Sequence, residues 1–133
     1  MILRKNLIFL FVFLVAPEVV LCKNYGKPVD VYSFAILLWQ VLALTEPFAG
    51  FDFEKHAYFV VQKGGRPKMS KKWPTLLKDI IKRSWSQNPC KRPNFGQICN
   101  SLKGECQDSS DNLSRTERLM NSSFSNTGLA FTL

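Results

Sequence analysis

The sequence has a single histidine, His56, and four cysteines, none of which stands in a CxxC spacing with another. Structural zinc sites draw their ligands from closely spaced cysteines and histidines, so a conventional zinc site is excluded. An even number of cysteines would permit two disulfide bonds in a secreted protein. We expect instead reduced thiols, buried as small apolar groups in a cytosolic domain. The four cysteines are Cys22, Cys90, Cys99 and Cys106.

Long apolar runs are also scarce, and the most pronounced extends only from Leu7 to Ala16. A membrane-spanning helix needs about 20 apolar residues, and Pro17 and Glu18 end this run early. Two cations followed by an apolar stretch nevertheless imitate a signal peptide, so residues 1–22 leave open a secretory or membrane-anchored protein. If residues 1–22 are not a signal, we expect a cytoplasmic protein that does not bind a membrane.

Acidic residues are few, because 10 Asp and Glu stand against 18 Lys and Arg, which gives a formal net charge of +8. Clustered cations suit nucleic acid, since they release counterions from phosphates. Those at 75–86, however, lie opposite an apolar stripe, as on a solvated helix face. We therefore expect no specific binding of nucleic acid. A protein partner or substrate is expected to dock on the helices. The cluster is Arg66, Lys68, Lys71, Lys72, Lys78, Lys82, Arg83, Lys91 and Arg92.

Helical periodicity dominates the rest of the sequence. It predicts helices at about 28–44, 53–63, 75–86 and 94–103, whereas alternating strand patterns are nearly missing. The predicted fold class is therefore mainly α. After the last helix the composition shifts to Ser, Asn, Asp and Thr, so residues 104–133 are expected to form a polar, disordered tail.

The first predicted helix, 28–44, is apolar on nearly every face. Pro28 suits its first turn, where the missing N–H would have no partner. A helix that is apolar all round must be enclosed by other elements, so we expect it to be the buried centre of the fold. The residues expected to be buried from the second and fourth helices are Phe53, Ala57, Val60, Val61, Phe95, Ile98, Cys99 and Leu102.

Four short motifs follow one another along the chain. With the Pro47-Phe48 pair that lies between the second and third of them, they make a series of five. The four are Ala16-Pro17-Glu18, Asp30-Val31-Tyr32-Ser33-Phe34 (running into Leu37-Leu38-Trp39), Gly64-x-Arg66-Pro67 and Trp85-x-x-x-Pro89-x-x-Arg92-Pro93-x-Phe95. In order and spacing the series resembles the C-terminal, helical lobe of a protein kinase catalytic domain, closest to the tyrosine-kinase-like and tyrosine kinase branches. We expect residues 16–103 to be a fragment of that lobe. Residues 1–15 then form an apolar segment of uncertain origin, and 104–133 the tail.

The resemblance implies structural roles for a few residues. Kinases pair the glutamate of the first motif with the arginine of the last, which predicts an ion pair between Glu18 and Arg92 here. Asp30 is implied to hydrogen-bond the backbone of the kinase catalytic loop, although the helix dipole alone also favours a carboxylate in a first turn. The remaining residues of the family motifs for which we expect a structural role are Trp85, Pro89 and Pro93.

The motifs that carry kinase chemistry are missing from the sequence. Phosphoryl transfer uses a glycine-rich loop and a lysine on ATP, a catalytic-loop aspartate, and a DFG aspartate that holds magnesium. None of GxGxxG, VAIK, HRD and DFG occurs. The resemblance implies a parent kinase that uses ATP and magnesium on Ser, Thr or Tyr hydroxyls of proteins. This chain itself is expected to have no catalytic, cofactor-binding or metal-binding residue and no activity.

Three interpretations follow from this combination. The chain is a fragment of a kinase, a small non-catalytic helical interaction module, or a secreted or anchored protein with residues 1–22 as its signal. A complete catalytic domain needs roughly double this length. The predicted central helix also lacks the kinase elements that would wrap it. We therefore expect Leu7–Val15 to pack on its uncovered face as a substitute.

Overall fold

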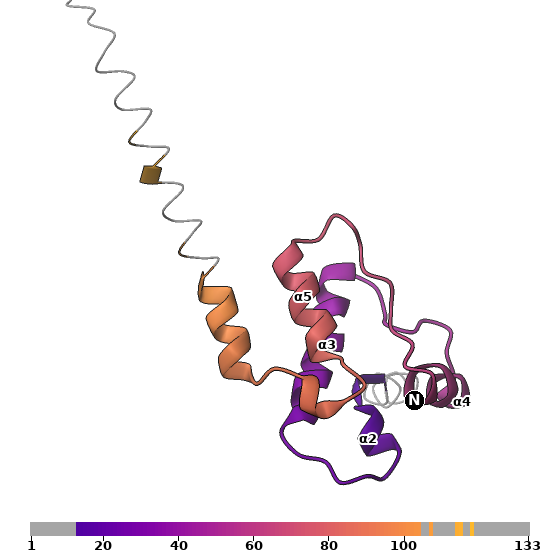
Figure 1. Ribbon diagram of the computed structural model, residues 1–133. Helices are drawn as coiled ribbons and strands as arrows, with labels where there is room; N and C mark the ends of the chain where they lie inside the picture. The colour runs from indigo at the N-terminus through magenta and orange to yellow at the C-terminus, as the bar shows by residue number, and fades with distance from the viewer. Residues whose placement is uncertain (1–12, 105–106, 108–113, 116–117, 119–133) are drawn as a thin grey trace, which may run out of the picture. The chain divides into compact units, whose positions relative to one another are not determined.

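The computed structural model describes residues 13–104, 107, 114–115 and 118. The chain divides into two compact units, Met1–Ile98 and Cys99–Leu133, and the site described below lies in the first. All regular secondary structure of the described residues is helical and none of it is strand, which confirms the expected mainly α fold (Figure 1). Within the same residues, no helix has the length and apolar character needed to cross a membrane.

The helices of the structure correspond closely to those predicted. From the N-terminus they are α2 (Pro17–Val20), α3 (Pro28–Ala43), α4 (Phe53–His56), the π-helical η1 (Ala57–Gln62), α5 (Thr75–Ser84) and the 3-10 turn η2 (Pro89–Lys91). Residues 95–104 are helical as well. The short α2 and the 3-10 turn η2 are the elements among these that the periodicity did not predict.

Local signals explain where these helices begin and end. Pro28 occupies the first turn of α3, and the helix ends at Leu44, whose φ of 52° is left-handed and whose N–H donates to the carbonyl of Gln40 at 2.9 Å. Asp52 caps α4, since its Oδ1 accepts the backbone N–H of Lys55 at 2.8 Å. Because α4 continues directly into η1, the two form one helical segment with a change of pitch in the middle.

The core lies where α3 packs against α5 (Figure 1). Its fully enclosed members include Tyr32 and Ile36 from α3 and Ile81 from α5. Trp39, also in α3, is 7% exposed, and its indole N–H donates to the carbonyl of Lys68 at 3.0 Å. This bond attaches the segment before α5 to the central helix.

One face of α3 is open, contrary to the expectation of a helix enclosed on all sides. Leu37, Val41 and Leu44 are 49%, 60% and 90% exposed, and we call these three residues the α3 stripe. Leu37 and Val41 are four residues apart in α3 and share one face, and Leu44 lies at the C-terminal end of that helix. The prediction was wrong for this face because the single sequence shows which residues are apolar but not which elements are present to cover them.

Some residues expected in the core are exposed. Phe53 is 57% exposed, because the π-helical pitch of η1 changes the register and directs Val60 and Val61, but not Phe53, into the core. Phe95 is 44% exposed and rests edge-on against the Phe34 ring, with ring centroids 5.6 Å apart. The expectation of buried thiols was also wrong for the described cysteines, which are free and exposed: Cys22, Cys90 and Cys99.

The segment before α2 contacts the fold at two places. The carbonyl of Leu14 accepts a hydrogen bond from the Ser33 hydroxyl on α3 at 2.7 Å. Phe13 is buried against Phe48 and His56 instead, so this part of the expected substitute packing is directed toward α4. The remainder of the predicted segment, residues 7–12, lies outside the described residues.

Most of the predicted tail also lies outside the described residues. Of its positions, residues 104, 107, 114, 115 and 118 are described, and they are helical. Arg118 Nε donates to the carbonyl of Ser114 at 3.1 Å, which is a contact between successive helical turns. The expectation of a polar, disordered tail stays a prediction.

Candidate functional site

The ion pair expected between Glu18 and Arg92 is present and buried. Arg92 Nη1 donates to Glu18 Oε1 at 2.7 Å and Nη2 donates to Oε2 at 2.9 Å, so the guanidinium grips the carboxylate with two parallel bonds. The side chains are 0% and 7% exposed for arginine and glutamate. Burial alone would raise the pKa of Glu18, but the hydrogen bonds and charge of Arg92 outweigh it and hold that pKa below its usual value.

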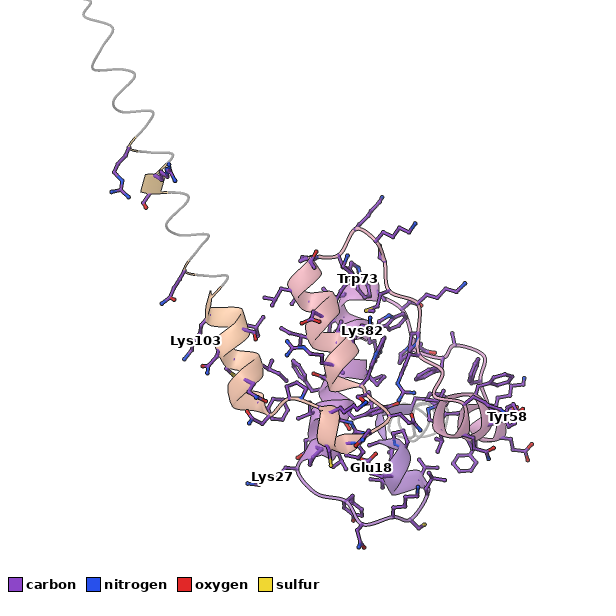
Figure 2. The ribbon with its side chains drawn as sticks, in the orientation of Figure 1. Glu18, Lys27, Tyr58, Trp73, Lys82 and Lys103 are labelled. Atoms are coloured by element: carbon purple, nitrogen blue, oxygen red, sulfur yellow. The ribbon has the colours of Figure 1, made fainter. Side chains whose placement is uncertain are left out.

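Arg92 also joins two further segments of the backbone. Its Nε donates to the carbonyl of Ser86 at 2.9 Å, just after α5, and Nη1 donates to the carbonyl of Pro28 at 2.9 Å, at the start of α3. One side chain thus connects α2, α3 and the segment that follows α5. We call Glu18 and Arg92 the buried pair. Figure 2 labels Glu18 near the lower end of the first unit.

A second arginine, Arg66, lies close to the Tyr32 ring, as Arg92 does. The guanidinium carbons of Arg66 and Arg92 are 5.1 and 5.0 Å from the centroid of the Tyr32 ring, which is completely buried. The Tyr32 hydroxyl has no hydrogen-bond partner among the described residues. Burial raises the pKa of Tyr32 against the opposing charges of the two arginines.

The Gly64-x-Arg66-Pro67 motif explains how Arg66 reaches this position. Gly64 has a left-handed φ of 72°, and a Cβ on Gly65 would lie 2.7 Å from the carbonyl oxygen of Phe59, so the turn needs both glycines. Arg66 Nε then donates to the carbonyl of Trp85 at 2.9 Å. Sequence reasoning placed Arg66 in a motif without giving it a role, and the motif itself was the available signal.

Most of the other family residues are buried or begin a helical turn. Trp85 is 6% exposed in the core, Pro89 begins η2, and Pro93 is buried directly after Arg92. Asp30 is exposed in the first turn of α3, and its implied bond to a catalytic loop stays a prediction. The structure therefore gathers Glu18 and Arg92 into one network and leaves Asp30 at the surface.

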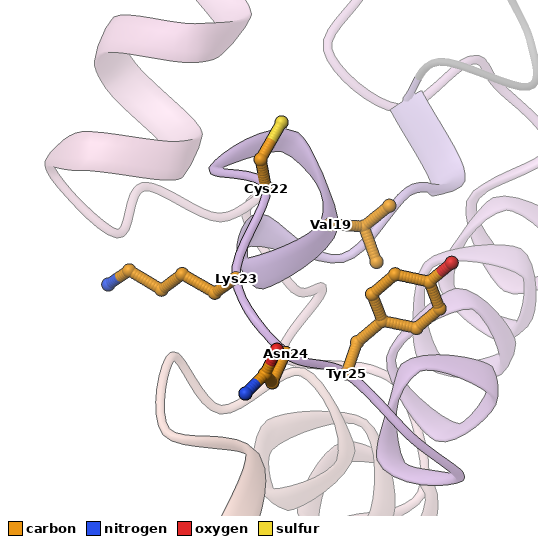
Figure 3. Close-up of a pocket in the computed structure, with 5 residues that line it drawn as sticks. All are labelled: Val19, Cys22, Lys23, Asn24 and Tyr25. Atoms are coloured by element: carbon orange, nitrogen blue, oxygen red, sulfur yellow. The ribbon is translucent and has the colours of Figure 1, made fainter.

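Metal-ligating side chains are not clustered among the described residues. Magnesium is held by carboxylate and other oxygen ligands. No group of three or more His, Cys, Asp or Glu side chains that could hold a metal ion occurs among the described residues. A hollow of about 690 Å³ next to α2 is lined by Val19, Cys22, Lys23, Asn24 and Tyr25 (Figure 3). Tyr25 is 68% exposed, and none of the described residues that line this hollow carries a carboxylate.

His56 is buried, and it contacts two aromatic rings that also contact each other. It is 1% exposed, with the Phe13 and Phe48 ring centroids at 5.0 and 5.1 Å, and neither ring nitrogen has a hydrogen-bond partner among the described residues. Burial and the charge of Arg66 lower the pKa of His56. The folded state therefore holds this imidazole neutral in conditions where an unfolded chain would protonate it.

We expect His56→Leu to reduce the loss of stability in mild acid. Because the pKa of His56 is lowered on folding, the unfolded chain binds the extra proton, so stability falls as the pH drops below the usual histidine value of about 6.5. Urea unfolding measured between about pH 7 and pH 5 should show a smaller loss for the variant. At pH 7 the variant should be at least as stable, since no buried bond is lost. An equal loss in both proteins would contradict the assignment.

Comparison with known proteins identifies the class to which this architecture belongs. A family profile described as "Protein tyrosine and serine/threonine kinase" matches residues 5–102. The chain therefore belongs to the protein tyrosine and serine/threonine kinase family.

Individual relatives are kinases of the tyrosine-kinase-like type. The chain is 42% identical over 83 residues to the serine/threonine/tyrosine-protein kinase HT1 of Arabidopsis thaliana, covering 62% of this chain and 21% of that protein. It is 39% identical over 85 residues to the dual specificity protein kinase shkB of Dictyostelium discoideum, covering 62% of this chain and 13% of that protein. It thus spans about a fifth or less of the length of these relatives.

Proposed function

We propose that this chain supplies the helical, C-terminal lobe of a tyrosine-kinase-like protein kinase. The observation that carries the proposal is the buried pair, which unites the motif at α2 with the motif after α5 in one folded unit. The parent kinase would transfer the γ-phosphate of ATP to Ser, Thr or Tyr hydroxyls of proteins in signalling. Within it, this lobe would serve as the scaffold on which the catalytic segments are mounted.

The α3 stripe supports a lobe that is one part of a larger domain. Three large apolar side chains lie exposed on one face of the helix that otherwise forms the core. Apolar surface of this kind marks contact with another segment or chain. In the second candidate function, a non-catalytic interaction module, the same stripe would be the place where a partner protein binds.

The buried pair also bears on where the chain would act. Cleavage of residues 1–22 as a signal would remove Glu18 and leave the charge of Arg92 buried without its carboxylate partner. An unpaired buried charge is strongly destabilising, so the fold favours a chain that keeps residue 18. This supports a cytoplasmic protein over a secreted one.

We expect the chain alone to show no kinase activity, because no motif that binds ATP–magnesium or activates a hydroxyl occurs in it. The full chain would be incubated with labelled ATP, magnesium and a general protein substrate, and its melting temperature measured with and without the nucleotide. No label transfer and no nucleotide-dependent melting shift are expected. A complete kinase such as HT1 is the positive control. Transfer above the enzyme-free blank would contradict the expectation.

Two further measurements separate the candidates. Transcript and genomic sequence upstream of the Met1 codon should contain an open frame that encodes HRD and DFG motifs if the chain is part of a kinase. Mass spectrometry of the natural N-terminus should not find a protein that begins at Lys23. A start at Lys23 would favour the secreted candidate, and the absence of any upstream frame would favour the interaction module.

A further inference from the structure

The cations of this protein fall into two groups in the structure. Arg66 and Arg92 are used internally, since their guanidinium groups donate to backbone carbonyls, to Gln87 and to the carboxylate of Glu18. A second group of lysines is exposed, apart from the half-buried Lys78, and forms no ion pair with any described residue. Of this group we define the lysine surface as Lys71, Lys72, Lys78 and Lys82.

The lysine surface is contiguous across two elements. Lys71 and Lys72 lie in the turn before α5, and Lys78 and Lys82 follow one another at a spacing of four along α5, so the latter two share one helix face. The Lys78 Nζ approaches the carbonyl oxygen of Lys71 at 3.5 Å, which joins the turn to that face. Figure 2 labels Lys82 on α5 and Trp73 near the N-terminal end of the same helix.

Negative charge is almost absent from the sequence around these lysines. Asp79 is the only acidic residue between Lys63 and Arg92, and its carboxylate lies 2.9 Å from Nε of Arg83. The positive charge of the lysine surface is therefore not balanced within the surrounding sequence. A surface of one sign attracts ligands of the other sign and raises their rate of association.

The composition of the surface favours one class of anionic partner. No large apolar side chain between residues 63 and 92 is exposed in the structure. An interfacial membrane contact would use apolar side chains at the rim, and single-stranded nucleic acid would use exposed aromatic rings for base stacking. A surface of flexible lysines without apolar neighbours is suited to binding a segment with several separate carboxylates, because each ammonium group can pair with a different carboxylate.

We propose that the lysine surface is a docking site for an acidic, Asp- and Glu-rich protein segment. The site lies on α5 and the turn before it, away from the α3 stripe in sequence, and its use does not depend on phosphoryl transfer by this chain. The proposal extends the function of the lobe from a scaffold to a recruiting surface.

The test uses the full chain and a fluorescently labelled peptide of alternating glutamate and serine. Binding would be followed by fluorescence anisotropy at about 0.05 M and about 0.15 M salt. The variant Lys72→Glu/Lys82→Glu removes two exposed members of the surface, and Lys23→Glu/Lys27→Glu is the matched control, with the same change in net charge at exposed positions elsewhere. We expect about tenfold weaker binding for the first variant and less than about twofold for the control.

Several outcomes would overturn the proposal. Equal losses in the two variants would mean that only overall charge matters, and absence of peptide binding to the unmodified chain would remove the site. Tighter binding of single-stranded DNA or phosphatidylserine vesicles, lost in the same variant, would assign the surface to a different class of partner. Circular dichroism checks the fold, and Lys72→Gln/Lys82→Gln replaces the charge reversal if that variant loses its helical spectrum.

Discussion

Replacing Arg92 with methionine is expected to lower the free energy of unfolding by about 3–5 kcal/mol, because it leaves the carboxylate of Glu18 buried without its partner. It also removes the donors to Ser86 and Pro28, so three segments lose a common anchor. Urea unfolding of the full chain, followed by circular dichroism at pH 7, measures the change.

The matched control is Arg83→Met, which breaks the exposed pair with Asp79 and should cost less than about 1 kcal/mol. The double variant Glu18→Gln/Arg92→Met should be less destabilised than the sum of its single variants, since no charge is then left unpaired. If Arg92→Met costs no more than Arg83→Met, the buried pair does not hold the lobe together.

Replacing Trp85 with alanine is expected to cost about 3–5 kcal/mol, the usual range for removing a large aromatic side chain from a core. Trp85 is 6% exposed and belongs to the same cluster as Tyr32, Ile36 and Ile81. A cavity at this position would also increase the mobility of the Trp85 backbone carbonyl, which accepts the hydrogen bond from Arg66 Nε. Chemical denaturation gives the stability, and near-ultraviolet circular dichroism reports whether the remaining aromatic packing persists.

Tyr25→Ala provides the comparison, because this aromatic residue is 68% exposed and its removal should change stability by no more than about 0.5 kcal/mol. Trp85→Phe should fall between the two, since it keeps an aromatic ring and leaves a smaller void. Similar costs for Trp85→Ala and Tyr25→Ala would mean that the region around Trp85 is not part of the cooperative core.

Local signals in the sequence were sufficient to predict the positions of the main helices. Pro28 marks the start of α3, Asp52 caps α4, and the apolar periodicity of α5 identifies its buried face. The buried pair could be predicted as well, because the family motifs specify both partners over a separation of 74 residues. These features depend on residue type and spacing, which a sequence states directly.

Other features depend on the arrangement of several elements and could not be predicted. The π-helical pitch of η1, which leaves Phe53 exposed, has no residue signature in a single sequence. The approach of both Arg66 and Arg92 to the Tyr32 ring requires knowledge of how the Gly64–Gly65 turn directs a side chain. The openness of the α3 stripe likewise reflects which neighbours are present.

The separation between the members of the buried pair has a consequence for synthesis on the ribosome. Glu18 and the apolar residues of α3 leave the exit tunnel well before Arg92, which is added 74 residues later. During this interval Ile36 and Trp39 have no α5 to pack against, and the Glu18 carboxylate stays hydrated. Domains generally fold as units, so productive folding must wait for the last motif. Until then the nascent lobe is a natural client for chaperones that hold apolar helices.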